Sequence, residues 1–228
     1  MVIGLVQARS SSSRFPGKML KAFGTTTVLG SVISRVKDSL TLDDIVILTS
    51  TDEADDALCE EARLLRVRVH RGPLENVASR FHNFLASESV EAFVRISGDS
   101  PLIDPALIDQ GVEQFRKSRA DLATNVLRRT FPTGQSVEVV RTSAYVRSFP
   151  LFSDKQHFEH VTAFFYENPG HFAIASFESE EDFSDVRLSI DYEHDYEVLT
   201  KVLNNNSADA GWKTLSTHWR SEILESKA

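Results

Sequence analysis

Short apolar runs rich in branched residues recur through the first half of the chain, and stretches with apolar residues at helical spacing separate them. The expected strands are 2–6, 45–48, 67–69, 93–96 and 122–126. The expected helices are 53–65, 74–87 and 105–117. Strands that alternate with helices in this way predict an α/β fold. We expect it to be Rossmann-like, with a mostly parallel sheet covered by helices on both faces.

The second half of the chain has a less regular pattern. The expected strands are 136–140, 172–177 and 187–190, and the expected helices are 155–166, 193–203 and 213–226. We find no internal repeat, low-complexity tract or linker. The sequence therefore predicts one domain, 1–228, in which residues 127–180 form a small inserted arm or subdomain across the open end of the sheet.

Composition narrows the class of protein further. The single cysteine, Cys59, rules out a disulfide framework within the chain and is typical of a reducing cytoplasm. The sequence shows no basic leader, cleavage site or membrane-spanning run, so we expect a cytoplasmic protein without membrane insertion. The net charge of −8 argues against nonspecific nucleic-acid binding, which relies on basic patches.

Residues 7–20 carry the strongest chemical signal, because they follow the first strand with Gln-Ala-Arg-Ser-Ser-Ser-Ser-Arg-Phe-Pro-Gly-Lys-Met-Leu. Small residues let backbone N–H groups converge on anionic oxygens, and Arg9, Arg14 and Lys18 add full positive charges. The stretch is not a Walker A loop, since serine and methionine stand where that motif needs glycine and Ser or Thr. It predicts polyphosphate binding, with an ordinary basic surface loop as the alternative.

The spacing of Gln-Ala-Arg, Ser, Arg and Pro-Gly-Lys in this stretch resembles the N-terminal signature of the sugar cytidylyltransferases. In particular it resembles the spore-coat polysaccharide cytidylyltransferase-like family, which is related to the CMP-KDO and CMP-sialate synthetases. The resemblance implies catalytic roles for Lys18, Arg9 and Arg14. It also implies a set of nucleotide-binding residues, namely Ala8, Arg9, Ser12, Arg14, Gly17, Lys18, Arg80 and Asp99.

A first carboxylate, Asp99, follows the apolar strand 93–96 within Ser-Gly-Asp-Ser-Pro-Leu-Ile-Asp. Ligands of open α/β sheets bind outside the carboxyl ends of strands, and Mg²⁺ prefers one or two carboxylates plus phosphate oxygens. Asp99 is therefore a candidate Mg²⁺ ligand, and the run resembles the family's Gly-Asp-Cys-Pro-Leu-Ile-Asp segment. Asp104 precedes Pro105 and is better explained as a helix cap.

A second group of carboxylates lies in Ser-Ile-Asp-Tyr-Glu-His-Asp, residues 189–195. The resemblance implies that Asp191 is the other metal ligand, while Asp195 opens a helix and is expected to be structural. Only the fold can bring Asp99 and Asp191 together, because they are far apart in the sequence.

Further stretches extend the resemblance to most of the chain. Arg80 lies in a segment that is near the nucleotide base in related enzymes, although a surface helix arginine is an equal alternative. Residues 131–139 resemble the segment that shapes the sugar site, and residues 158–162 resemble the helix that follows it; the resemblance implies acceptor-binding roles for Glu138 and His160. For His160, ordinary packing on a helix is the alternative. The sequence offers no zinc-site spacing, Gly-x-Ser-x-Gly elbow or dinucleotide fingerprint.

Together with these residues, the resemblance implies a Mg²⁺-dependent enzyme that uses CTP to activate a sugar, an acidic 2-keto sugar above all, and releases pyrophosphate. The resemblance also implies surface polysaccharide synthesis and a homodimer formed through residues 127–180. Two alternatives stay open. One is the same fold acting on another nucleoside triphosphate or on a phosphonate or phosphorylated acceptor; the other is a nonenzymatic nucleotide-binding protein.

Overall fold

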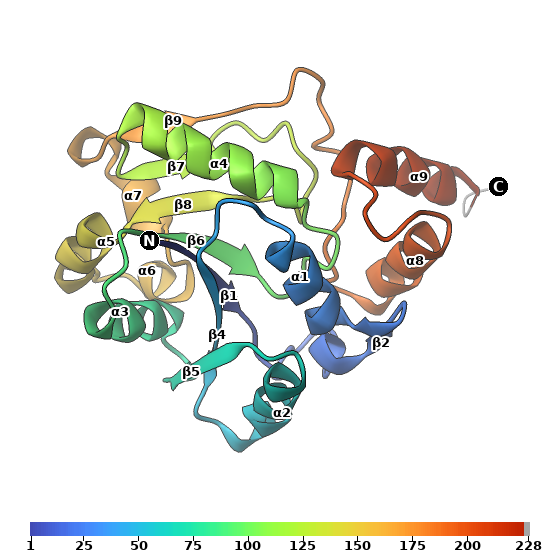
Figure 1. Ribbon diagram of the computed structural model, residues 1–228, viewed down its shortest axis with the longest axis horizontal. Coiled ribbons are helices and arrows are strands. Elements are labelled where there is room, and N and C mark those ends of the chain that lie inside the picture. Colours follow the sequence, from blue (N-terminus) through green and yellow to red (C-terminus); the bar gives the residue numbers. More distant parts are fainter. Residues whose placement is uncertain (226–228) are drawn as a thin grey trace.

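A twisted seven-stranded sheet runs through the centre of the molecule, and the computed structural model describes residues 1–225 (Figure 1). Its strands, in spatial order, are β5 (Arg68–Gly72), β4 (Asp44–Ser50), β1 (Val2–Gln7), β6 (Ala92–Ser97), β8 (Glu138–Arg141), β7 (Leu122–Thr124) and β9 (Ile174–Ser176). Strand β8 runs antiparallel to β6 and β7, and the other neighbouring pairs are parallel. The sheet confirms the mostly parallel α/β fold. A separate hairpin pairs β2 (Ala22–Phe23) with β3 (Thr26–Thr27).

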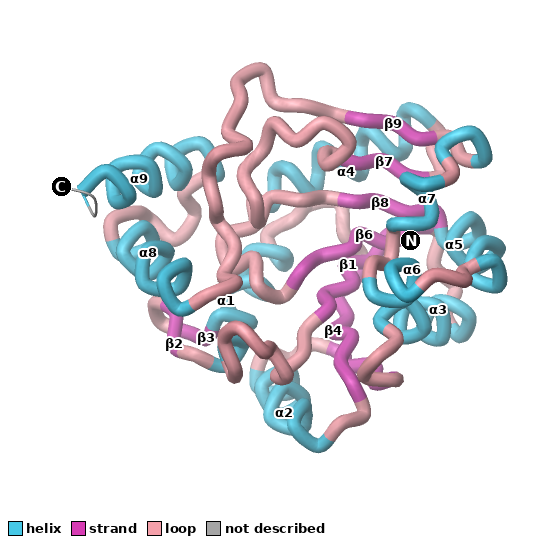
Figure 2. The backbone as a smooth tube through the Cα atoms, turned by 180° about the vertical axis from the view of Figure 1, so that it is seen from behind, coloured by secondary structure: helices cyan, strands magenta, loops and turns pink. Residues whose placement is uncertain are grey.

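Helices cover both faces of this sheet (Figures 1 and 2). One layer holds α1 (Val28–Lys37), α2 (Asp56–Leu64), α4 (Pro105–Ser118), α8 (Glu193–Asn204) and α9 (Trp212–Glu225). The other holds α3 (Val77–Ser87), α5 (Thr142–Ser148), α6 (Lys155–Glu159) and α7 (Ala163–Glu167). No helix of the described residues is long and apolar enough to cross a membrane.

Strand β1 is apolar from Val2 to Val6 because both of its faces are covered. Val2 and Val6 belong to the core under the α1 layer, whereas Ile3 and Leu5 belong to the core under the α3 layer. Successive side chains of a strand point to opposite faces, so a strand buried on both sides reads as a continuous hydrophobic run. The chain must turn polar where β1 ends, and that is where the loop of residues 8–17 leaves the sheet.

Two helices of the structure were not predicted from the sequence, and one predicted strand is wrong. Helices α1 and α5 were not anticipated, and residues 187–190 form no strand. That segment makes a single bridge between Thr133 and Arg187, and then Ile190 N donates to Asp99 O at 2.8 Å. The segment therefore runs between two loops without pairing as a strand, and its apolar residues are buried in the hydrophobic core on the α1 side of the sheet.

The helix expected over 155–166 is broken into α6 and α7. His160 has an extended backbone, with φ −108° and ψ 93°. The break lets Thr162 Oγ1 reach the buried carboxylate of Glu138 at 2.7 Å, a contact that a propensity argument has no means to anticipate. Residues 127–180 contribute β8 and β9 to the main sheet and α5 to α7 to one helical layer. Of the helix expected over 213–226, residue 226 lies outside the described part of the chain.

Candidate active site

Three adjoining cavities open at the carboxyl edge of β1 and β6. The loop cavity, about 350 Å³, lies beside residues 8–18 and α3. The aspartate cavity, about 200 Å³, is lined by both Asp99 and Asp191. The helix cavity, about 350 Å³, lies against α7 and the end of α6. Arg95 lines all three cavities, so they lie around this one side chain.

The loop of residues 8–17 is fixed at both ends. At its start, Ser10 N donates to the buried carboxylate of Asp55 at 2.6 Å, and Asp55 also accepts from Thr49 and Ser50. Burial favours the neutral acid, but these hydrogen bonds outweigh burial and lower the pKa of Asp55. At its end, Gly17 adopts a left-handed φ of 70° and leads into the short helix that carries Lys18.

The predicted nucleotide-binding residues of this loop line one cavity, except for Gly17. Ala8 and Ser12 line the loop cavity; Ala8 N donates to Leu48 O, and Ser12 Oγ accepts from Phe15 N at 3.3 Å. Arg9 also lines the cavity and forms an ion pair with Glu159 at 3.3 Å. Gly98 must be glycine, because a Cβ there would lie 2.9 Å from Gln7 O.

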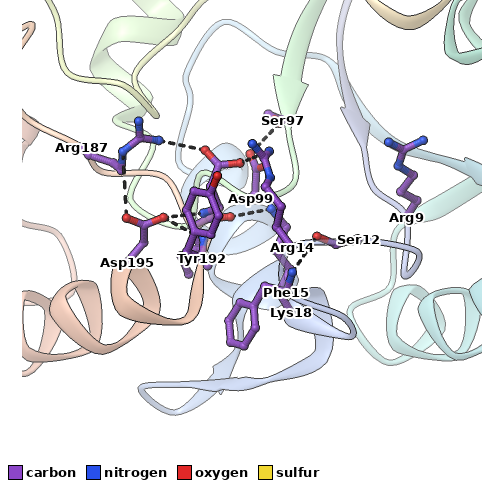
Figure 3. A network of polar contacts seen from close by, with 12 residues as sticks. Arg9, Ser12, Arg14, Phe15, Lys18, Ser97, Asp99, Arg187, Tyr192 and Asp195 are labelled. Atoms are coloured by element: carbon purple, nitrogen blue, oxygen red, sulfur yellow. Dashed lines mark hydrogen bonds and ion pairs between the residues drawn. The ribbon is translucent and has the colours of Figure 1, made fainter.

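Lys18 joins the two segments that carry the predicted metal ligands. Its Nζ donates to Asp99 Oδ2 at 2.9 Å and to Ile190 O at 2.5 Å (Figure 3). The lysine side chain is only 6% exposed, while that of Asp99 is 24% exposed. Ser97 Oγ donates to the other oxygen, Asp99 Oδ1, at 2.7 Å. Lys18 is thus held in place by groups of the protein and still borders the loop cavity.

Asp191 lies between two arginines that come from different parts of the chain. Its Oδ1 accepts from Arg14 at 2.5 Å, and its Oδ2 accepts from Arg187 at 2.8 Å. The guanidinium of Arg14 also lies over the ring of Tyr192, 5.3 Å from its centre. Asp195 accepts from the backbone N–H groups of Asp191 and Tyr192, which confirms its expected structural role at the start of α8.

The residues at this edge fit a divalent cation of the magnesium type. Asp99 and Asp191 face one cavity, although they come from opposite halves of the chain. No cluster of three or more His, Cys, Asp or Glu side chains at metal-binding distance occurs in residues 1–225. Mg²⁺ commonly takes one or two carboxylates and completes its shell with water and substrate phosphates, so a two-carboxylate donor set suits it. Asp104 caps α4 by accepting from Ala106 N, as expected.

Arg80 is a buried cation that forms no ion pair with a carboxylate of residues 1–225. It lies on α3, is 2% exposed, and borders the loop cavity. Its Nε has no hydrogen-bond partner among the described residues. Burial, and then the charge of Arg9, lower the pKa of Arg80. The alternative of a surface helix arginine is therefore wrong, and an anionic or carbonyl-bearing ligand would satisfy this group.

Of the two predicted acceptor-binding residues, Glu138 is fully engaged by the protein. Its Oε2 accepts from Arg95 at 2.6 Å, and its Oε1 accepts from Thr162 at 2.7 Å and Tyr166 at 2.6 Å. Burial alone would raise the pKa of Glu138, but Arg95 and the two hydroxyls outweigh burial and lower it. His160 is exposed and borders both the loop and the helix cavities. Both acceptor roles stay predictions.

Three charged residues of the site were missed in the sequence. Arg95 interrupts the apolar strand β6, and a charged residue inside a buried strand is a usable signal. Arg187 stands four residues before Asp191, a spacing that could have suggested an ion pair. The sequence gives no indication that Asp55 belongs to the site, because an acidic residue before a helix is ordinarily a helix cap.

Known proteins are similar in sequence to this chain over most of its length. Residues 3–214, which include the loop and both aspartates, match the cytidylyltransferase family. The chain is 32% identical over 207 residues to the spore coat polysaccharide biosynthesis protein SpsF of Bacillus subtilis, covering 87% of this chain and 84% of that protein.

Two solved structures share the fold. A cytidylyltransferase from Leptospira borgpetersenii superposes with a TM-score of 0.90 and 30% identity, over 99% of this chain and 94% of that one. A CMP:2-keto-3-deoxy-manno-octonic acid synthetase complexed with CTP superposes with a TM-score of 0.69 and 13% identity, over 89% of this chain and 98% of that one.

Proposed function

This chain belongs to the cytidylyltransferase family, and from that premise we propose that it transfers CMP from CTP to a sugar of the acidic 2-keto class for surface polysaccharide synthesis. The observation that carries the proposal is the convergence of Asp99 and Asp191 beside the cationic loop. The description of SpsF as a spore coat polysaccharide protein and the CTP bound to the structural neighbour support the pathway and the nucleotide.

The triphosphate would lie in the loop cavity. Arg9, Arg14, Lys18 and Arg80 border that cavity and supply positive charge to a protein whose net charge is negative. Arg80 needs a partner, and the ammonium of Lys18 has a third hydrogen free after its two bonds to the protein. These cations would neutralise the pyrophosphate as it leaves.

Asp99 and Asp191 would hold Mg²⁺, and a bound Mg²⁺ would supply positive charge to the α-phosphate and to the attacking sugar oxygen. The sugar hydroxyl attacks the α-phosphorus and loses its proton, while the bond from that phosphorus to pyrophosphate breaks. The residues contribute mainly by positioning and by charge.

The acceptor would occupy the helix cavity, next to the site of attack. His160 borders this cavity, and Glu138 holds Arg95 and Tyr166 in its wall. Residues 127–180, which supply much of this wall, are also where we place the interface of a homodimer.

A nucleotide-binding and turnover experiment tests this function. Calorimetry with Mg²⁺ should show binding of CTP in preference to UTP, ATP and GTP, and a panel of keto sugar acids should yield one that supports pyrophosphate release. Lys18→Ala should lower turnover by about 10²-fold, the scale for loss of one charge-stabilising group. Lys21→Ala is the matched control, because the Lys21 ammonium lies over the ring of Phe15 instead of facing the carboxylates.

Near-wild-type turnover in Lys18→Ala would contradict the role given to the lysine. Preference for another nucleotide would keep the fold and change the substrate. Binding of CTP without pyrophosphate release, whatever acceptor is added, would indicate a binding protein.

A further inference from the structure

The two cation–carboxylate pairs at the mouth of the site differ in how firmly they are held. Lys18 and Asp99 form a largely buried pair, and Lys18 is also tied to Ile190 O. Arg14 and Asp191 form a pair in which the arginine is 55% exposed and comes from the middle of the 8–17 loop. Arg14 has no other carboxylate partner in the described residues. It is therefore the cation that can move.

Asp191, in contrast, stays in place without Arg14. Its second oxygen accepts from Arg187, and its backbone N–H donates to Asp195. The preceding residue, Ile190, donates its N–H to Asp99 O. Loss of the Arg14 contact would leave a fixed carboxylate with one arginine partner at the aspartate cavity, which shares Asp99 with the loop cavity that would receive the phosphates.

Because positive and negative side chains balance at this edge, the Arg14–Asp191 pair disfavours binding of a triphosphate that carries no metal ion. Three cations and three carboxylates lie at this edge in two ion-paired groups: Lys18 with Asp99, and Arg14 and Arg187 with Asp191 and Asp195. A triphosphate without metal must take Arg14 away from Asp191 and then lie near the exposed carboxylate. A divalent cation that arrives with the triphosphate removes both costs, because it replaces Arg14 at the carboxylate.

We propose that Asp191, through its exchangeable pair with Arg14, makes the site discriminate against metal-free triphosphate and in favour of the metal complex. The inference rests on the proposed function, since it assigns triphosphate to the loop cavity. It gives Asp191 a role in selecting between metal-free and metal-bound triphosphate, in addition to its role as a metal ligand. Because linkage is reciprocal, the triphosphate strengthens metal binding by the same factor as the metal strengthens triphosphate binding.

The test is calorimetry of inorganic tripolyphosphate in EDTA, on full-length protein. Asp191→Asn should bind about threefold more tightly than wild type, the gain expected for release of one exposed ion pair. Asp195→Asn removes the same charge but has no contact with Arg14, and its amide oxygen can still accept from the backbone; its affinity should change less than about twofold. In an Arg14→Gln background, Asp191→Asn should give a smaller gain, because only the repulsion by the carboxylate is left to remove.

Every outcome decides the proposal. No gain in Asp191→Asn, or no binding by that variant, overturns it. An equal gain in Asp195→Asn, or in the Arg14→Gln background, assigns the effect to net charge and also overturns it. Tripolyphosphate carries no base, so this result is separate from failure of the proposed function, which would appear as absence of selective CTP binding with Mg²⁺.

Discussion

Glu138 and Asp191 are both carboxylates that face arginines at the carboxyl edge of the sheet, yet their surroundings differ. Glu138 is 3% exposed, and its partners come from β6 and from the α7 segment, which are themselves packed. Asp191 faces a cavity, and one of its partners comes from a loop. Ion pairing alone therefore does not show whether a carboxylate serves the fold or a ligand. A carboxylate whose partners are all fixed stabilises the fold, whereas one with an exchangeable partner is available to a ligand.

The largest effect that tests this comparison concerns stability. Glu138→Ala should lower the free energy of unfolding by about 3–5 kcal/mol, because it leaves Arg95 and two hydroxyls without their buried partner. Thermal or urea unfolding measures this. Asp191→Asn should cost less than about 1 kcal/mol, since its arginines are exposed. Equal losses in the two variants would remove the distinction.

A smaller effect is expected on stability at low pH. The pKa of Glu138 is lowered in the folded protein from an ordinary value of 4.5, so its contribution to stability is present above about pH 4.5 and lost as the pH falls through the folded pKa. The melting temperature of wild type should therefore fall more steeply below pH 4.5 than that of Glu138→Gln. Parallel curves for the two proteins would show that Glu138 does not titrate on unfolding.

The smallest effect concerns a second open pair, Arg9 with Glu159, whose side chains are both 38% exposed. Glu159→Gln should tighten binding of CTP with Mg²⁺ by about twofold, because it releases Arg9 toward the loop cavity at the cost of one exposed pair. Calorimetry measures it. The gain should vanish in an Arg9→Gln background; a gain that persists there would count against exchange as the cause.

Hydrophobic periodicity predicted the mostly parallel sheet, because strands such as β1 are buried on both faces and leave a continuous apolar run. The same signal misled at residues 187–190, because Leu188 and Ile190 are buried in the hydrophobic core without pairing as a strand. The break at His160 follows from a contact with Glu138 that is distant in the sequence. Local patterns carry no information on such contacts.

The candidate site was predictable where residue type and spacing suffice. Lys18, Asp99 and Asp191 were singled out from motifs, and the fold supplied their convergence. Two features could not be predicted from the sequence, namely the hydrogen bond from Ser10 N to Asp55 and the position of Arg95 beside three cavities. Both depend on how separate strands are placed side by side.

The bond from Lys18 Nζ to Ile190 O has a consequence for how the protein is made. It joins residues 172 positions apart in the chain. Closing a loop of that length costs roughly 4–5 kcal/mol of chain entropy, so this contact forms only when the rest of the fold supports it. During synthesis, the sheet strands β1, β4, β5 and β6 leave the ribosome long before Ile190 does. A nascent or truncated chain therefore holds the cationic loop without the second aspartate, and activity appears only after the whole domain has been made.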